Sequence, residues 1–522
     1  MAGAKYFLET FGCQMNILDS QLVEGRLRAR GMTPVGNYRD ADVILFNTCS
    51  VRQHAEDKVF ARLGQLKGLK QSRPATIVGV IGCMAERVRR NLFVRAPHLD
   101  LICGPGELSE LPTLLDQVRE RREQVAALAG SQTRRARIPR HAGEDYRLET
   151  LDLSRSPNVG GSVLQSYVRV QRGCDKFCTY CVVPFVRGPE RSRPPANIVA
   201  EARRLAGFGC REVTLLGQTV NSYAYEEDGG AVRFARLLER VHEVAGIDRI
   251  RFVTSYPADW DEDIFRVMRD YPRIMPYLHI PAQSGSDRIL KAMRRNYTAD
   301  SYLNLMDTAR KHVPEIALAG DFIVGFCGET EEDFRQTVDL VRHVEYESLF
   351  IFKYSPRPGT KADRIADDDV PQEVKVRRNT ELLAIQSEIS HRHKQGLIGR
   401  EVEVLVEGPS KAARKARGET SSQQRTRGKH SPAFSGGGQS SSFAQGSRRS
   451  GPQTRPTTDA GNPTIQLVGR TPGDLMAVFD TPPEHIGAVV KVYVESASAQ
   501  TLSGRVTKIV SAARSPQGTT AS

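Results

Sequence analysis

The pattern of apolar and polar positions over residues 4–125 repeats a simple unit. Short apolar runs are each followed by a stretch with apolar residues at helical spacing, as NILDSQLVEGRLRARG follows the first run; the runs are KYFLETFGC, DVILFNTC, TIVGVIGC and LDLICGPG. Short buried strands that alternate with amphipathic helices predict an α/β domain built on a doubly wound parallel sheet.

The same alternation returns over residues 160–395. The predicted strands lie in SYVRVQRGC, EVTLLGQ, RIRFVTS, YLHIPAQSGS, IALAGDFIVGF and SLFIFKYSPRPG, and helical patterns separate them. About six parallel strands are too few for a closed eight-stranded barrel, so the pattern predicts an open (βα)6 partial barrel. In such barrels the chemistry lies at the carboxyl ends of the strands.

The remaining segments differ in pattern. Residues 396–512 carry short alternating runs separated by turns, which predict a small β-barrel. Residues 409–462 interrupt it with a Ser-, Gly- and Gln-rich basic stretch that has few large apolar residues, so we predict a disordered insertion there. The weakly patterned residues 126–159 are predicted to form a linker.

Composition narrows the class of protein. The chain has 522 residues, 39% hydrophobic and 26% charged, which is typical of folded domains outside the membrane. No apolar run approaches the roughly 18 residues that span a bilayer, and the first residues lack a secretory signal pattern. Nine cysteines in such a chain favour thiols or metal ligands over disulfides. We therefore expect a cytoplasmic protein without membrane association.

The net charge is +13, which invites a nucleic-acid partner. Residues 409–462 contain ten Lys or Arg and two acidic residues, so eight of these charges belong to the predicted insertion. The excess elsewhere is modest, and charge by itself leaves nucleic-acid binding open.

The stretch GCDKFCTYC carries the most specific chemistry. Cys174, Cys178 and Cys181 have the spacing C-x3-C-x2-C directly after the first predicted barrel strand. A structural zinc site takes four protein ligands, and an ordinary 4Fe–4S cluster takes four thiolates. Three thiolates on a four-iron cluster leave one iron free to chelate a small molecule. A redox C-x-x-C pair and a zinc knuckle are the alternatives, and the spacing and position favour the cluster.

Three further cysteines occupy equivalent positions in the first domain. Cys13, Cys49 and Cys83 each follow the carboxyl end of a predicted strand, the edge at which open α/β sheets bind ligands. A single free cysteine there is more often a packed apolar residue, but three at equivalent positions favour a shared site. Cys103 also ends a strand, and geometry does not exclude it.

Several blocks of sequence resemble the radical S-adenosylmethionine methylthiotransferase family. They are QRGCDKFCTYCVVPFVRGPERSRP, LLGQTVNSY, LHIPAQSGSDRILKAMRR, DFIVGFCGETEEDF, YSPRPGTKA, TFGCQMN, NTCSVR and GCMAE. The resemblance implies that the Cys174, Cys178 and Cys181 cluster binds and cleaves S-adenosylmethionine, and that an auxiliary 4Fe–4S cluster is held by Cys13, Cys49 and Cys83. Cys103 matches no ligand position of the family. The last domain resembles the TRAM domain, an RNA-binding barrel, and the basic insertion there is equally consistent with RNA binding and with filler.

The closest branch of that family is the one that acts on N6-dimethylallyladenosine, or isopentenyladenosine, in tRNA. By this resemblance the protein is a transferase that methylthiolates carbon 2 of that base at position 37. S-adenosylmethionine would serve both as methyl donor and as radical source. The alternatives within the family are threonylcarbamoyl-adenosine in tRNA and an aspartate of a ribosomal protein. The resemblance further implies a monomer that meets the tRNA anticodon loop and an electron donor such as flavodoxin or ferredoxin.

Other residues are candidates for contact with the cofactor. Gln218 ends a strand beside the proposed cluster, where it could contact the methionine part or simply cap the strand. Ser284, Ser286, Asp321 and Gly325 lie where radical-enzyme relatives hold ribose and adenine. Arg187, Arg191 and Arg193 form a basic run after the cysteines, suited to a phosphate, a carboxylate or solvent.

Overall fold

The computed structural model describes residues 3–50, 53–128, 149–154, 164–418 and 464–513. They divide into two compact units, one ending at Ile389 and the next beginning at Ser390. None of the helices in the described ranges is long and apolar enough to cross a membrane.

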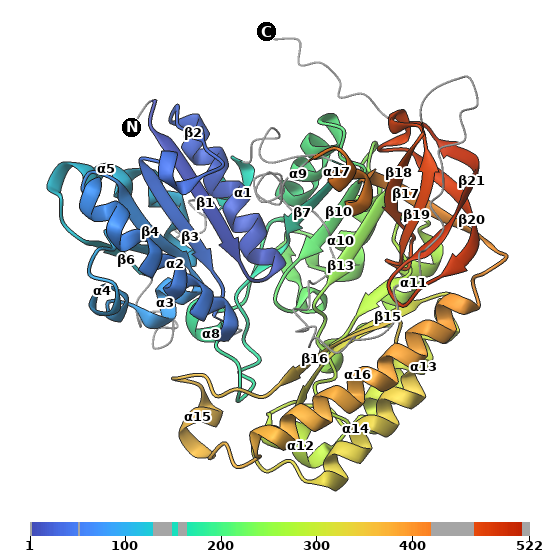
Figure 1. Cartoon of the computed structure of the whole chain (residues 1–522). Coiled ribbons are helices and arrows are strands. Elements are labelled where there is room, and N and C mark those ends of the chain that lie inside the picture. The colour runs from blue at the N-terminus through green and yellow to red at the C-terminus, as the bar shows by residue number, and fades with distance from the viewer. Residues whose placement is uncertain (1–2, 51–52, 129–148, 155–163, 419–463, 514–522) are drawn as a thin grey trace, which may run out of the picture. The chain divides into compact units, whose positions relative to one another are not determined.

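The first domain is built on a parallel sheet (Figure 1). Its six strands lie in the order β2-β1-β3-β4-β5-β6. Their bounds are Lys5–Phe11 (β1), Thr33–Pro34 (β2), Val43–Thr48 (β3), Ile77–Gly82 (β4), Leu101–Cys103 (β5) and Val125–Ala127 (β6).

Helices cover both faces of this sheet. On one face α1 (Gln14–Ala29) and α5 (Leu111–Arg121) share an apolar core with β3 and β4. On the other face α2 (Gln53–Ser72), α3 (Cys83–Val88) and α4 (Asn91–Arg95) pack against the opposite side of the same strands. Because helices cover both faces of this parallel sheet and bury its strands on both sides, the prediction of a doubly wound sheet is confirmed.

The second domain contains the six predicted parallel strands. They form two groups, β13-β10-β7 and β14-β15-β16, and a bridge between Ile250 and Ile274 leads from one group to the other. The strands are Gln165–Arg169 (β7), Glu212–Leu216 (β10), Arg249–Val253 (β13), Tyr277–His279 (β14), Ala317–Val324 (β15) and Ser348–Lys353 (β16). The helices around them are Val183–Val186 (α8), Pro195–Gly207 (α9), Phe234–His242 (α10), Asp263–Asp270 (α11), Asp287–Ala292 (α12), Ala299–His312 (α13), Glu331–Val344 (α14), Lys361–Ile365 (α15) and Gln372–Gln395 (α16). The open barrel is therefore confirmed.

The two sides of each barrel strand have different roles. Val168, Val213, Phe252 and Leu318 belong to the core shared with the surrounding helices. Because strand side chains alternate in direction, their immediate neighbours in sequence face the barrel interior. The interior set includes Arg169, Leu216, Val253, His279 and Asp321 at or near the carboxyl ends of the strands.

The second unit contains a closed five-stranded barrel, as predicted. Its order is β17-β18-β19-β21-β20, from Glu401–Pro409 (β17), Ile465–Arg470 (β18), Met476–Thr481 (β19), Val489–Ala497 (β20) and Leu502–Ser511 (β21). Alternate residues of these strands, such as Val404 and Val490, are fully buried inside the barrel.

Two boundaries differ from the predictions. The supposed linker 126–159 begins inside β6, and residues 149–153 are helical; three residues of strand are too few to produce a recognisable alternation. The supposed insertion 409–462 begins with the end of β17 and with α17 (Lys411–Ala416), whose first turn the Ser410 side chain caps. Residues 419–462 of the predicted insertion lie outside the described residues.

Candidate iron–sulfur site

The first set of three cysteines lies at one edge of the N-terminal sheet. Cys13 follows β1 and directly precedes α1, Cys49 follows β3, and Cys83 follows β4 and begins α3. Gly12 has a φ of +121°, and a Cβ at this position would lie 2.1 Å from the Cβ of Cys49. Glycine therefore lets the ends of two neighbouring strands approach closely enough for their cysteines to interact.

The charges around this set act unequally on its thiols. A hydrogen bond with Cys49 lowers the pKa of Cys13 to about 6; burial opposes this, and the Arg187 guanidinium lowers it further. Burial raises the pKa of Cys83 to about 11, although Arg187 acts in the opposite direction. Since a thiol must lose its proton to bind iron, the nearby cation favours ligation.

Arg187 reaches this site from the second domain. It follows α8, and its Nη2 lies 2.9 Å from Asn16 Oδ1 and 2.8 Å from Asp19 Oδ2, both on α1. Val182 and Val186, on the same short segment, pack against Cys83. This segment begins one residue after Cys181, so the two cysteine sets adjoin the same stretch of chain.

The second set lies on a loop that the backbone holds in several places. Cys174 N–H donates to Gly188 O at 3.2 Å, and Thr179 N–H donates to Met293 O at 3.0 Å. Gly173 has a φ of +67°, and a Cβ there would lie 2.0 Å from Pro189 O. The loop can therefore close on itself only with glycine before the first cysteine.

Arg295 lies against this loop. Its guanidinium donates from Nη1 to Cys178 Sγ at 3.4 Å, from Nη2 to Pro281 O at 2.9 Å and from Nε to the Tyr297 hydroxyl at 2.8 Å. The guanidinium carbon is 4.6 Å from the centroid of the Tyr256 ring. The guanidinium therefore places a charged hydrogen-bond donor directly against the sulfur of Cys178.

The other two thiols of this loop are desolvated. Burial raises the pKa of Cys174 to about 12, with a backbone hydrogen bond at Lys176 opposing it. Burial likewise raises the pKa of Cys181 well above its ordinary value, and the neighbouring Cys178 adds to the effect. Loading these thiols with iron therefore requires the release of protons.

The donor chemistry of both sets suits iron–sulfur clusters. Within the described ranges no three His, Cys, Asp or Glu side chains converge tightly enough to hold a single metal ion. A 4Fe–4S cluster instead takes one thiolate per iron. Each set of three cysteines supplies thiolates for three irons of such a cluster, and its assignment to a cluster with one open iron stays a prediction.

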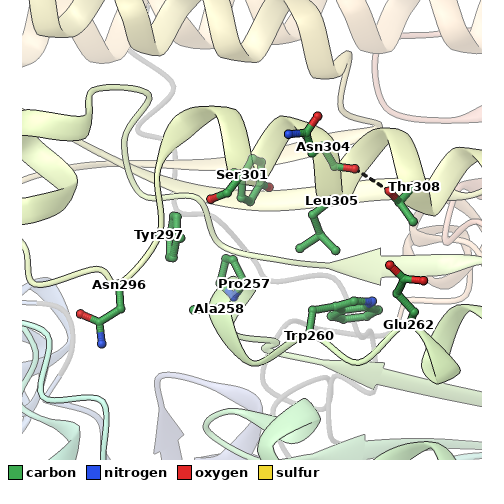
Figure 2. A pocket seen from close by; sticks show the side chains of 11 residues that line it. Pro257, Ala258, Trp260, Glu262, Asn296, Tyr297, Ser301, Asn304, Leu305 and Thr308 are labelled. Carbon is green, nitrogen blue, oxygen red and sulfur yellow. Dashed lines mark hydrogen bonds between the residues drawn. The ribbon is translucent and has the colours of Figure 1, made fainter.

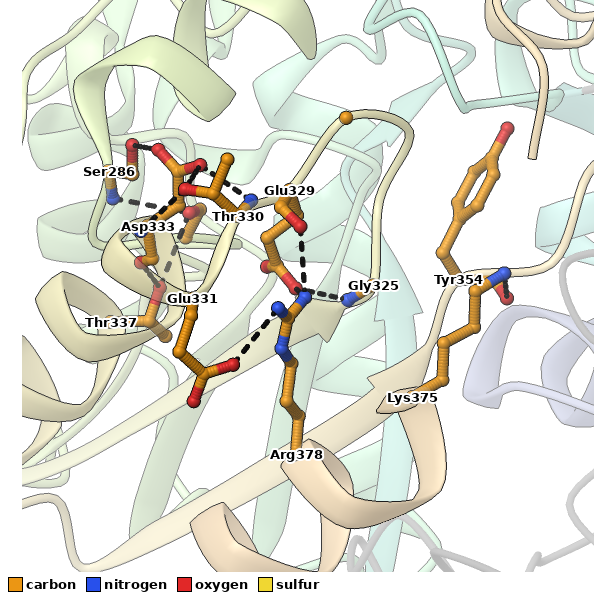
Figure 3. A network of polar contacts seen from close by, with 12 residues as sticks. Ser286, Gly325, Glu329, Thr330, Glu331, Asp333, Thr337, Tyr354, Lys375 and Arg378 are labelled. Atoms are coloured by element: carbon orange, nitrogen blue, oxygen red, sulfur yellow. Dashed lines mark hydrogen bonds and ion pairs between the residues drawn. The ribbon is translucent and has the colours of Figure 1, made fainter. Parts of the chain in front are cut away.

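Two of the predicted cofactor contacts, Ser284 and Ser286, are buried among structural partners. The Ser286 hydroxyl caps α12 and donates to Asp333 Oδ1 at 2.6 Å (Figure 3). Ser284 Oγ lies 3.4 Å from the Thr337 hydroxyl. Both residues thus attach the loop after β14 to α14.

The remaining predicted contacts follow or lie on the barrel strands β10 and β15. Gln218 follows β10 and is half-buried. Asp321 faces the interior from β15 with Oδ2 3.5 Å from His279 Nε2, and its buried Oδ1 has no hydrogen-bond partner. The Gly325 N–H donates to Glu329 Oε2 at 2.6 Å, so the turn after β15 is held by a carboxylate that also binds Arg378 (Figure 3). Contact of these residues with a cofactor stays a prediction.

Some features of the site have little or no signal in the sequence. Arg295 ends the block LHIPAQSGSDRILKAMRR, but nothing in that block indicates that its side chain contacts Cys178. For the basic run Arg187, Arg191 and Arg193, the sequence leaves a phosphate, a carboxylate and solvent as possible partners. Arg187 and Arg193 are buried against carboxylates, which excludes solvent for these two. Cys103 is buried in the apolar core, in agreement with a packing role.

A separate pocket of about 400 Å³ opens beside this region (Figure 2). Pro257, Trp260, Tyr297 and Ser301 are among its lining residues, and the indole Nε1 of Trp260 is buried without a hydrogen-bond partner. Glu262 also lines it.

The fold and the cysteine loop define the class of the protein. A partial barrel with C-x3-C-x2-C after its first strand is the architecture of a radical S-adenosylmethionine enzyme, and the model of the "Radical SAM superfamily" matches residues 168–341. The model of "Uncharacterized protein family UPF0004" matches residues 5–104, the part that carries Cys13, Cys49 and Cys83.

Several relatives that share one name match most or nearly all of the chain. A tRNA-2-methylthio-N(6)-dimethylallyladenosine synthase of Rhodopirellula baltica is 42% identical over 502 residues, 96% of this chain and 95% of the relative. Synthases of that name from Carboxydothermus hydrogenoformans and Parabacteroides distasonis are 45% and 38% identical, over 79% and 96% of this chain and 90% and 95% of their own lengths. The chain belongs to the tRNA-2-methylthio-N(6)-dimethylallyladenosine synthase family.

Proposed function

We propose that this enzyme transfers a methylthio group to carbon 2 of N6-dimethylallyladenosine at position 37 of tRNA, with S-adenosylmethionine as methyl donor and as radical source. The observation that supports this most directly is that both three-cysteine sets adjoin the segment of residues 182–187: Cys181 directly precedes it, and Cys83 packs against it. One set suits radical formation, and the other suits storage of the sulfur that is transferred. The near full-length similarity to synthases of that name supports the choice of base.

The six cysteines would hold the two clusters. Cys174, Cys178 and Cys181 would bind the one that meets S-adenosylmethionine, and Cys13, Cys49 and Cys83 would bind the auxiliary one. A 4Fe–4S cluster with an open iron supplies, when bound, the electron that cleaves the carbon–sulfur bond of S-adenosylmethionine.

The side chains around the cysteines prepare the site for this chemistry. Arg295 directs a charged donor at Cys178 Sγ and fixes the loop to Pro281 and Tyr297. The barrel wall keeps water from a reactive radical. Gln218, Ser284, Ser286, Asp321 and Gly325 are proposed to orient S-adenosylmethionine, with Asp321 able to accept a hydrogen bond at Oδ1 inside the barrel.

The partners follow from the reaction. The substrate is tRNA, which we propose to bind through its anticodon loop, with the closed barrel of the second unit as a further RNA contact. We propose a cytoplasmic monomer that receives electrons from a flavodoxin or a ferredoxin.

Nucleoside mass spectrometry of tRNA tests the reaction. Cells with and without the gene are compared, and the deleted strain is complemented with the wild-type gene, with Cys49→Ala and with Cys103→Ala. We expect the methylthiolated nucleoside to disappear on deletion while its unthiolated precursor accumulates, and to return with the wild type and Cys103→Ala only. Unchanged dimethylallyladenosine derivatives would reject the proposal and direct attention to threonylcarbamoyl-adenosine.

A further inference from the structure

Arg187 is a buried cation between the two domains of the first unit. Its side chain is 7% exposed, and Asp19, which it contacts, is 1% exposed. It is contributed by the segment that follows the Cys174–Cys181 loop, while its contacts Asn16 and Asp19 belong to the first two turns of α1. The two contacts span 171 and 168 residues of sequence.

The guanidinium is held next to the proposed auxiliary ligands. Cys13 directly precedes α1, and its Sγ lies 3.7 Å from Asn16 Oδ1, the same oxygen that Arg187 contacts. Cys83 packs against Val186, the residue before Arg187. The interaction is also electrostatic: Arg187 acts to lower the pKa of both Cys13 and Cys83, against the effect of burial.

Asp19 does not neutralise this arginine by itself. Its other carboxylate oxygen pairs with Arg169, so one carboxylate faces two guanidinium groups. Arg169 also lies 3.8 Å from Asp152. Burial lowers the pKa of Arg187, but the charges of Cys83, Asp19 and Cys13 outweigh it and raise that pKa. Because Asp19 is shared with Arg169, part of the positive charge of Arg187 is not offset and can act on the thiols of Cys13 and Cys83.

We propose that Arg187 is a positioning residue that holds positive charge against the auxiliary cluster and stabilises its reduced state. This rests on the proposed function, which assigns Cys13, Cys49 and Cys83 to that cluster. Reduction adds one electron from an external reductant and neither makes nor breaks a bond. The potential of such a cluster depends on its net charge, on hydrogen bonds to its sulfurs and on exposure, and a buried cation that salt hardly screens favours the added negative charge.

The test measures the auxiliary cluster by itself in the full-length chain. Cys174, Cys178 and Cys181 are replaced by Ala, the chain is reconstituted anaerobically, and the midpoint potential is followed by electron paramagnetic resonance during titration with dithionite. Iron per chain is measured on every sample, and no step depends on tRNA or on turnover.

Arg187→Gln and Arg187→Lys are compared with the matched control Arg169→Gln, which removes the other partner of Asp19. We expect Arg187→Gln to lower the reduced-to-oxidised ratio at a fixed applied potential by at least about tenfold, which is about 59 mV for one electron. Arg187→Lys keeps the charge and is expected to retain most of the potential, and Arg169→Gln to leave it nearly unchanged.

Three results would overturn the proposal while leaving the auxiliary site in place. An equal shift in Arg187→Gln and Arg169→Gln would show that the potential depends on the charge network as a whole and not on the position of Arg187. A full complement of iron with an unchanged potential in Arg187→Gln would remove the electrostatic role. If the Arg187→Gln chain binds no iron, the Arg187→Lys chain provides the test. A tenfold change in its reduced-to-oxidised ratio, although the positive charge is retained, would contradict the proposal. Failure of the parent triple-alanine chain to load a cluster would instead reject the auxiliary site, and with it the role of Arg187.

Discussion

Replacement of Arg295 by Gln tests whether the cation beside Cys178 matters for radical formation. The substitution removes the donor that lies 3.4 Å from Cys178 Sγ and removes the only charge of the side chain. It leaves the backbone of the loop and the three cysteines unchanged. We expect slower cleavage of S-adenosylmethionine with little loss of folded protein.

The structure indicates where the energetic cost falls. Without Arg295 the Tyr297 hydroxyl keeps its hydrogen bond to Ala282 O at 2.8 Å. Its single hydrogen cannot also serve Pro281 O, which lies 3.3 Å away, so the loss falls on Cys178 and on the Pro281 carbonyl. A hydrogen bond to a charged group contributes about 1.5–3 kcal/mol, and about 1.4 kcal/mol corresponds to a tenfold change. The expected decrease in rate is about 10- to 150-fold.

The assay measures the initial rate of 5′-deoxyadenosine formation with dithionite and substrate tRNA, alongside iron per chain. Arg295→Lys keeps a charge but not the planar fork, so its rate should lie between those of the wild type and Arg295→Gln. Arg294→Gln is the matched control, since Arg294 is exposed and adjacent, and it should stay within about threefold of the wild type. A rate within threefold for Arg295→Gln at full iron content would refute the reasoning.

Three further predictions concern other parts of the structure. Cys49→Ala should lose about four iron atoms per chain and the methylthiolated product while it still forms 5′-deoxyadenosine, whereas Cys103→Ala should keep its iron; equal iron in the two variants would contradict the auxiliary site. Gly173→Ala should impair loading of the radical cluster, because the added methyl would lie 2.0 Å from a backbone carbonyl oxygen, while Gly229→Ala, with nothing within 4 Å, should load normally in the same iron assay. Burial raises the pKa of Asp333, but hydrogen bonds from neighbouring side chains outweigh it and hold that pKa below its usual value. Its stabilisation is therefore present at neutral pH and lost as pH falls below about 4, so Asp333→Asn should lower Tm at pH 7 and approach the wild type in acid; a pH-independent difference would exclude this ionisation as the cause.

The elements themselves could be predicted because their signals are local. Strands such as Val43–Thr48 and helices such as Phe234–His242 differ in the period of their apolar residues, and that period is visible within one element. The short strand Val125–Ala127 has too few residues to show a period, so it was absorbed into a predicted linker. Ser410 and α17 were likewise hidden in a stretch whose composition suggested disorder.

The roles of individual polar residues were harder to predict from the sequence. Ser286 lies near the end of a barrel strand and suggested a cofactor contact, yet in the structure its hydroxyl caps α12 and binds Asp333 on a helix 47 residues away. Serine at such a position satisfies either role, and only its neighbours in space distinguish them.

The sequence by itself therefore determined the order of elements, the three kinds of domain and the two sets of cysteines at strand ends, because each depends on spacing within a few residues. The tertiary structure alone decided which charges reach those cysteines. Arg295 meets Cys178 across 117 residues and Arg187 meets Asp19 across 168, and such contacts arise only when separate elements pack against one another. A buried charge must find a partner within a few ångströms, and the partner is chosen by packing rather than by position in the chain.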